Sequence, residues 1–260
     1  MTLGVPFLSF TQTKTYTEAD EGSGPDGDVP FFEELTYTEE FTTTGAGINL
    51  KLGVIYRHNQ MLRLGLAVHS PTAYSLEDNF TTAMDYSFLN GSIIAEGSAD
   101  SPDGFFDYKL RSPWRFIGSA GVIIQKKGFL SAEIEWVDYS GASFRYDGFP
   151  EDEREVNNDI ETNLQSALNI RLGGELAMDI FRLRAGLGLL PSPLAKDDTI
   201  QNAISLGVGV RQQNYFIDLA YRRMSSNSEY RPYLTSDAPE QVVDVSSNNN
   251  NFYLTFGFKF

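Results

Sequence analysis

The residues best suited to binding chemistry are arginines that alternate with apolar side chains along several segments of the chain. A guanidinium offers a planar fork of charge-assisted hydrogen-bond donors, which suits a carboxylate ligand. The same arginines could instead pair with carboxylates of the protein in a structural salt-bridge network. The candidates that share the polar side of the alternation are Arg63, His69, Arg115, Glu133, Glu135, Arg171, Arg182 and Arg184, with Asp218 as a further ion-pair partner.

Composition limits the classes of function open to the chain. Its 260 residues carry a formal net charge of -15, which argues against a nucleic-acid partner because phosphate binding needs a basic surface. The absence of Cys excludes disulfides, thiolate zinc sites and Cys nucleophiles. No stretch approaches the roughly 18 uninterrupted apolar residues that a membrane helix requires, whereas membrane-spanning strands need no such stretch.

Apolar and polar residues alternate with a period of two, the pattern of strands with one apolar and one polar face. In Gly47–Arg57 and again in Asn251–Phe260 the even-numbered residues are apolar. Charged residues in these periodic segments fall on the polar face. The pattern predicts an all-β protein with about ten antiparallel strands, at about 1–18, 31–57, 61–88, 104–126, 129–146, 163–178, 180–190, 201–212, 214–232 and 251–260.

Short and long connections alternate between these strands. Tight turns are expected at 58–60, 127–128, 179 and 213, and long polar loops at 19–30, 89–103, 147–161, 191–200 and 233–250. The long loops together carry a net charge of -17, which leaves +2 on the remaining residues. Short turns at one end and long loops at the other are typical of a transmembrane β-barrel of the bacterial outer membrane. A soluble up-and-down barrel is the alternative, but its connections would be short at both ends.

Several segments resemble the C-terminal part of the FadL/TodX family of outer-membrane transporters for hydrophobic compounds, in its Bacteroidetes-type version. They are GAGINLKLGVIYR, LRLGLAVHSPTAYSLED, SPWRFIGSAG, KKGFLSAEIEWVDYSGASF and FYLTFGFKF. The resemblance implies a barrel of roughly fourteen strands, an N-terminal hatch and a kinked strand that opens a lateral exit. The start, MTLGVPFLSF, has no signal-peptide pattern, so we expect residues 1–260 to be one barrel domain that lacks the hatch and the first strands.

The resemblance implies passive uptake of hydrophobic small molecules, such as long-chain fatty acids or aromatic hydrocarbons. A general porin, or a barrel scaffold that displays surface adhesion loops, is the alternative. Expected partners are the hydrophobic substrate, outer-membrane lipid and glycolipid, and the barrel-assembly machinery through the strand that ends at Phe260. We expect no enzyme activity, cofactor or metal site, because His69 lies on the polar face and His58 in a turn, where neither fits a barrel phospholipase or a metal site.

Other residues have two interpretations each. Pro71 and Pro113 could mark an unpaired stretch of wall with a second lateral gap, or a bulge that bends long strands. The acidic segment Asp147–Glu161 could bridge divalent cations to glycolipid, or be a solvated loop. A fatty-acid head held by Arg63, Arg115 or Arg182 would place its tail among aromatic residues such as Tyr108, Phe144 and Tyr146, or against the hatch. Aromatic residues expected to form a girdle at the membrane interface, rather than to stack on a ligand, are Tyr56, Trp114, Trp136, Tyr139, Tyr215 and Phe260.

Overall fold

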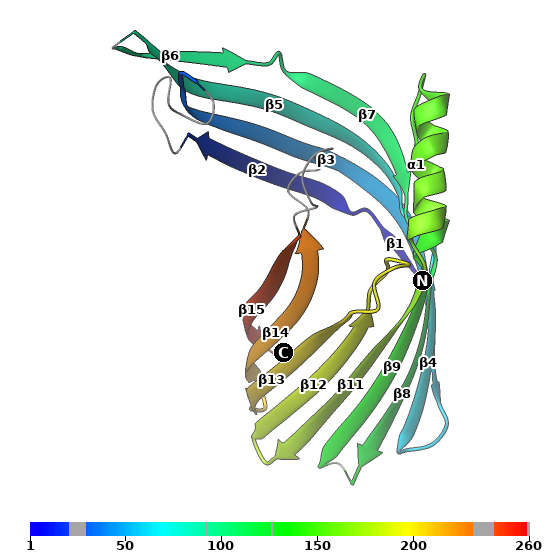
Figure 1. Ribbon diagram of the computed structural model, residues 1–260. Coiled ribbons are helices and arrows are strands. Elements are labelled where there is room, and N and C mark those ends of the chain that lie inside the picture. Colours follow the sequence, from blue (N-terminus) through cyan, green and yellow to red (C-terminus); the bar gives the residue numbers. More distant parts are fainter. Residues whose placement is uncertain (21–29, 92, 126, 231–241, 259–260) are drawn as a thin grey trace.

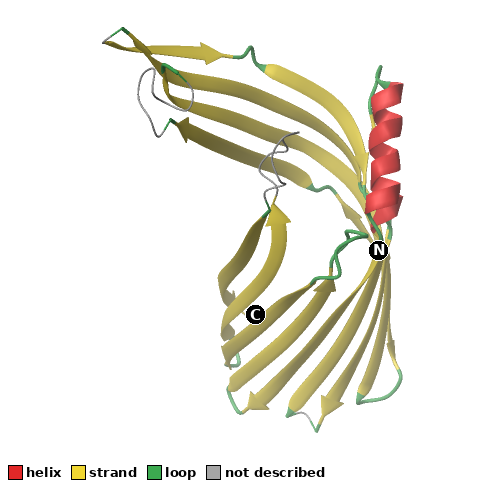
Figure 2. Cartoon of the chain, viewed as in Figure 1, coloured by secondary structure: helices red, strands yellow, loops and turns green. Residues whose placement is uncertain are grey.

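The computed structural model of the protein describes residues 1–20, 30–91, 93–125, 127–230 and 242–258. Nearly all of the described chain is strand (Figure 2). No helix in these ranges is long and apolar enough to cross a membrane. The strands are β1 (Thr2–Gly4), β2 (Phe7–Ala19), β3 (Phe32–Arg57), β4 (Leu62–His69), β5 (Ala73–Asn90), β6 (Ile93–Asp100), β7 (Gly104–Arg111), β8 (Arg115–Ile124), β9 (Gly128–Asp138), β10 (Ser143–Arg145), β11 (Ser166–Met178), β12 (Phe181–Pro191), β13 (Ile200–Arg211), β14 (Tyr215–Tyr230) and β15 (Val243–Phe258).

The fifteen strands form one antiparallel sheet, which confirms the predicted all-β antiparallel class. The sheet is open: in the described residues β15 pairs only with β14, and β1 and β2 pair only with β3. Figure 1 shows two parts. We call the part made of β1, the C-terminal half of β3, β4, β8, β9 and β11 to β15 the lower sheet. The part made of β2, the N-terminal half of β3, β5, β6, β7 and β10 is the upper sheet, which bends away from the lower one.

The count of fifteen exceeds the expected ten because four long strands are interrupted and β6 adds one more. The expected strand 61–88 is divided into β4 and β5, and 104–126 into β7 and β8. The strand 1–18 is divided at Pro6, and 129–146 contains a short 3-10 helix, η2 (Tyr139–Gly141). Among the described strands, only β3 runs without interruption through both sheets.

Three of the expected long loops, 89–103, 147–161 and 233–250, contain regular structure, so their assignment as loops was wrong. The segment 89–103 holds β6, which forms a hairpin with β5 through Gly91, a residue with a φ of 71°. The segment 147–161 belongs largely to helix α1 (Pro150–Asn163), which stands beside β7 and β10 (Figure 1). Pro150 at the helix start and three acidic residues in the first turn favour this helix, because both suit an N-terminus. The expected loop 233–250 ends in strand, because β15 begins at Val243, whereas 233–241 and most of 19–30 lie outside the described residues.

The interruptions lie side by side at one level of the wall. Pro71 is in the segment between β4 and β5, and Pro113 is in the segment between β7 and β8. Proline cannot donate to the ladder, but the serine before each proline still pairs with the neighbouring segment. The Ser70 N–H donates to Leu50 O at 2.8 Å, and the Ser112 N–H donates to Thr72 O at 3.1 Å. Ser70 Oγ accepts from the Leu50 N–H at 2.9 Å, and Ser112 Oγ accepts from the Thr72 N–H at 2.9 Å. The strands therefore remain bonded across both proline segments.

Removing the Ser112 hydroxyl tests this bonding. Thr72 is only 8% exposed, so Ser112→Ala leaves a buried N–H without its acceptor and should destabilise the fold by about 1 kcal/mol. The matched control is Ser101→Ala, because Ser101 Oγ accepts from the Thr82 N–H at an exposed position. Urea unfolding in detergent micelles measures both. Equal effects of the two substitutions would contradict the assigned role of Ser112.

The lower sheet has one apolar and one polar face, as the alternation predicts. Large apolar side chains on the apolar face are exposed, among them Leu66 at 67% and Phe256 at 61%. Contiguous exposed apolar surface of this kind marks a membrane or protein contact. Tyr56, Trp114, Trp136 and Tyr215 are also exposed, and Tyr139 lies in η2, whereas Phe260 is outside the described residues.

Candidate functional site

Cross-strand register brings the predicted charged residues of β8, β9 and β11 into one network on the polar face. Arg171 is the direct partner of Glu133, and its Nη1 lies 2.6 Å from Glu133 Oε1. Arg171 Nη2 also approaches Glu135 Oε1 at 3.3 Å, and Arg115 Nη1 lies 3.9 Å from Glu135 Oε2. Glu135 is 6% exposed and accepts a further hydrogen bond, of 2.8 Å, from Asn169 Nδ2. We call this group the upper ion network.

A second group, the lower ion network, lies on β11, β12 and β14. Arg184 Nε donates to Glu175 Oε2 at 2.7 Å, and Arg184 Nη1 donates to Asp218 Oδ1 at 2.7 Å. Arg182 Nε lies 3.7 Å from Glu175 Oε1, and its Nη1 donates to the backbone oxygens of Asp179 and Phe181. Both networks correspond to the structural interpretation of these arginines.

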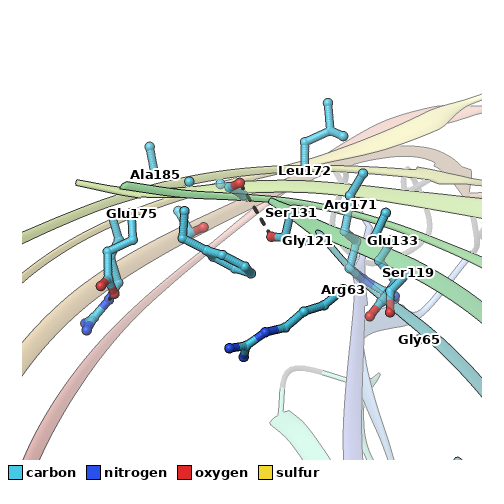
Figure 3. A pocket seen from close by; sticks show the side chains of 18 of the residues that line it. Arg63, Gly65, Ser119, Gly121, Ser131, Glu133, Arg171, Leu172, Glu175 and Ala185 are labelled. Carbon is cyan, nitrogen blue, oxygen red and sulfur yellow. Dashed lines mark hydrogen bonds and ion pairs between the residues drawn. The ribbon is translucent and has the colours of Figure 1, made fainter. Parts of the chain in front are cut away.

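Between the two networks runs a groove with a cavity volume of about 780 Å³. Its floor is a row of small residues, one from each of five adjacent strands, which the register places directly opposite one another. They are Gly121, Ser131, Gly173, Gly186 and Ser205. Side chains of the two ion networks, including Glu133 and Glu175, line its sides (Figure 3).

A side chain at two of the floor glycines would meet the hydroxyls of the neighbouring serines, which would have to turn away. A Cβ added at Gly186 would lie 2.6 Å from Ser205 Oγ, and one at Gly173 would lie 3.0 Å from Ser131 Oγ. Both distances are shorter than ordinary van der Waals contact. The groove is therefore a consequence of small residues held in register across the sheet.

Arg63 lies at the β4 end of this row, where it is the direct partner of Gly121. Its side chain extends into the groove and away from Glu133 (Figure 3). Among the described residues no carboxylate lies within ion-pair distance of Arg63, in contrast to Arg115, Arg171, Arg182 and Arg184. Arg63 is thus the arginine of the groove whose charge is available to a ligand.

The remaining candidates lie apart from the groove. His69 is the direct partner of both Lys51 and Arg115 near the upper end of the lower sheet. Pro71 and Pro113 lie above it, between the two sheets. Sequence reasoning missed Glu175 and Asn169, although both share the polar-face spacing of Arg171. No group of three or more His, Asp or Glu residues in the described part could hold a metal ion.

The aromatic residues expected to receive a ligand tail are brought together on the upper sheet. The ring centroids of Tyr108 and Phe144 are 5.6 Å apart, and those of Tyr108 and Tyr146 are 6.2 Å apart. Burial, together with the neighbouring Asp78 carboxylate, raises the pKa of Tyr108 to about 12 and also raises the pKa of Tyr146. Tyr108 lies level with Gly45 of β3, because both pair with Leu76. Arg63 pairs with Arg57 of β3, which is twelve residues further along the same strand. At about 3.3 Å per residue this is about 40 Å, so one fatty acid cannot contact both places.

Comparison with known proteins gives a distant likeness among solved structures and none elsewhere. No family model matches the chain, and no curated protein matches it. Among solved structures, a match is found to the crystal structure of a Pseudomonas aeruginosa FadL homologue, with 10% sequence identity and a TM-score of 0.44. The match covers 98% of this chain and 89% of that chain. A likeness this distant carries no argument about function, which must be drawn from the residues of this chain.

Proposed function

We propose that the chain forms part of the wall of an outer-membrane β-barrel that admits hydrophobic small molecules carrying a carboxylate, such as long-chain fatty acids. The observation that carries this proposal is the groove that ends at Arg63, which has no ion-pair partner among the described residues. The exposed apolar face of the same sheet supports a membrane position, because it would contact lipid while the groove faces the barrel interior. The resemblance to FadL/TodX transporters noted in the sequence agrees with this substrate class.

The groove suits a ligand with a charged head and a long tail. Arg63 can donate two parallel hydrogen bonds to a carboxylate, and it need not first break an ion pair within the protein. From Arg63 to Ser205 the row crosses five strand spacings, or about 24 Å at about 4.8 Å each. The small side chains leave this length open for an extended hydrocarbon tail.

Arg63→Ala should weaken binding of a long-chain fatty acid by about tenfold, because one exposed charge-assisted contact is lost. Binding of the methyl ester of the same acid should not change, since the ester carries no charge. Equilibrium titration of the 260-residue chain in detergent, followed by uptake assays in cells, measures the effect.

The matched control is Arg211→Ala, which also removes one arginine but from a position against the Phe216 ring, outside the groove lining. Its affinity for the fatty acid should equal that of the unchanged protein. If Arg63→Ala and Arg211→Ala bind the acid equally well, Arg63 is not the carboxylate site. A polar solute that enters as readily as the fatty acid would instead indicate a general porin.

A further inference from the structure

Asp78 lies on the upper sheet, far from the groove, on the same face as the aromatic residues. The register pairs it with Thr43 of β3 on one side and with Phe106 of β7 on the other. Its Oδ1 accepts hydrogen bonds from Thr43 Oγ1 at 2.6 Å and from the Tyr108 hydroxyl at 3.2 Å. Thr43 is 7% exposed, so two donors hold the carboxylate in a fixed position at the edge of the buried region.

A cluster of five aromatic rings adjoins this carboxylate through Tyr108, which donates to it, and Phe106, its partner in the register. Phe106 meets Tyr146 edge to face at 5.1 Å and meets Phe149 at 5.8 Å. Tyr108 lies 6.0 Å from Phe106, and Phe144 lies 5.9 Å from Tyr146. These rings also join β7 to the segment before α1. Asn157 of α1 holds that segment, because its Oδ1 accepts from the Phe144 N–H at 2.8 Å and its Nδ2 donates to the Phe144 carbonyl at 2.9 Å.

The carboxylate of Asp78 has no cationic partner within ion-pair distance among the described residues. The nearest basic residue along β7, Lys109, has the opposite parity to Tyr108 and pairs with Asp147 instead. If the aromatic cluster served only to anchor α1, an apolar residue at position 78 would make the fold more stable, because a half-buried carboxylate without a cationic partner costs free energy. Asp78 therefore needs an explanation beyond packing.

A positive charge is the ligand feature that both elements favour. The face of an aromatic ring attracts cations through its quadrupole, and the fixed carboxylate attracts them directly. An anion would be repelled by Asp78, and a neutral ligand would gain only from contact with the rings. A metal ion is disfavoured, because the described residues offer no group of three or more suitable ligands.

We propose that Asp78 and the surrounding rings form a binding site for a small organic cation with a quaternary ammonium group. The carboxylate neutralises the charge, and the rings of the half-buried Tyr146 and the exposed Phe149 contact the methyl groups. The site is separate from the groove, and the proposal does not depend on transport of fatty acids.

The test uses choline as the probe and 3,3-dimethyl-1-butanol, which has the same shape without the charge, as the comparison. Both are titrated into the 260-residue chain in detergent, with isothermal titration calorimetry as the readout. Choline should bind at least tenfold more tightly than the neutral alcohol. Equal affinity for the two compounds would overturn the proposal.

Asp78→Asn keeps the shape and an oxygen that can accept from Thr43 and Tyr108, and it should weaken choline binding at least tenfold. The matched control is Glu77→Gln, which removes the same charge from the neighbouring residue on the opposite face and should leave binding within twofold. Tyr146→Leu removes one ring and should also weaken binding. Equal affinity of Asp78→Asn and Glu77→Gln for choline would show that Asp78 is not part of a cation site. Fatty-acid binding by Asp78→Asn should stay unchanged, which separates this test from that of the groove.

Discussion

Replacing Leu219 by Arg is expected to destabilise the folded chain in phospholipid vesicles by about 2–4 kcal/mol, the cost of a charge near the bilayer midplane on a barrel wall. Leu219 lies on the apolar face of β14 and is 47% exposed. Its direct partners in the neighbouring strands, Val208 and Leu254, are also apolar. The free energy of unfolding in urea measures the loss, and the heat-dependent gel shift of a folded barrel provides a second readout.

The control for this substitution is Thr255→Arg. Thr255 is in the adjacent strand, pairs with Asp218 on the polar face, and would offer the new charge an acidic neighbour. We expect less than about 0.5 kcal/mol of change there, typical of a surface substitution. If both variants lose stability equally, or if the chain is recovered as a soluble monomer without detergent, the membrane position of the apolar face is wrong.

Replacing Arg171 by Met should cost about 3 kcal/mol of stability. The substitution leaves the buried Glu135 carboxylate with only Asn169 and the more distant Arg115, and breaking a buried pair usually costs 3–5 kcal/mol. We expect the low end of this range because the Arg171 side chain is 40% exposed and solvent screens part of its charge.

Arg63→Met distinguishes a structural arginine from one available to a ligand. It removes the same charge but breaks no ion pair among the described residues, so stability should change by less than about 0.5 kcal/mol. The free energy of unfolding in urea is measured for Arg171→Met and Arg63→Met. The double variant Arg171→Met with Glu135→Gln should regain stability relative to Arg171→Met, because it removes the carboxylate left without its partner. An equal loss in both single variants would place Arg63 in an ion network after all.

Sequence periodicity predicted the faces of the lower sheet well, because a period of two assigns each residue to one side of a strand. It did not predict which residues lie opposite each other. The pairing of Arg171 with Glu133, and the alignment of Gly121 with Ser131 across the groove, depend on register, which parity leaves free. This is why sequence alone could not separate Arg63 from the paired arginines.

The upper sheet was predicted less well for a different reason. Helix α1 and strand β6 lie in polar, acidic segments, where the apolar periodicity that marks a buried face is absent. Pro150 is a helix-start signal and Asn90-Gly91 is a hairpin-turn signal. Without apolar periodicity beside them, the polar composition of both segments favoured a loop. The breaks at Pro71 and Pro113 were recognised as positions without a ladder donor at similar heights, whereas the serine hydrogen bonds that join the strands there required the structure.

The uninterrupted course of β3 has a consequence for what the cell presents to its surroundings. Its 26 residues extend about 86 Å at about 3.3 Å each, and a tilted membrane strand uses only about 9–11 residues. With the lower sheet placed in the bilayer, about half of β3 and the strands bonded to it stand outside the membrane as a rigid projection. In the proposed outer-membrane position, large molecules outside the cell would meet this upper sheet before they meet the groove.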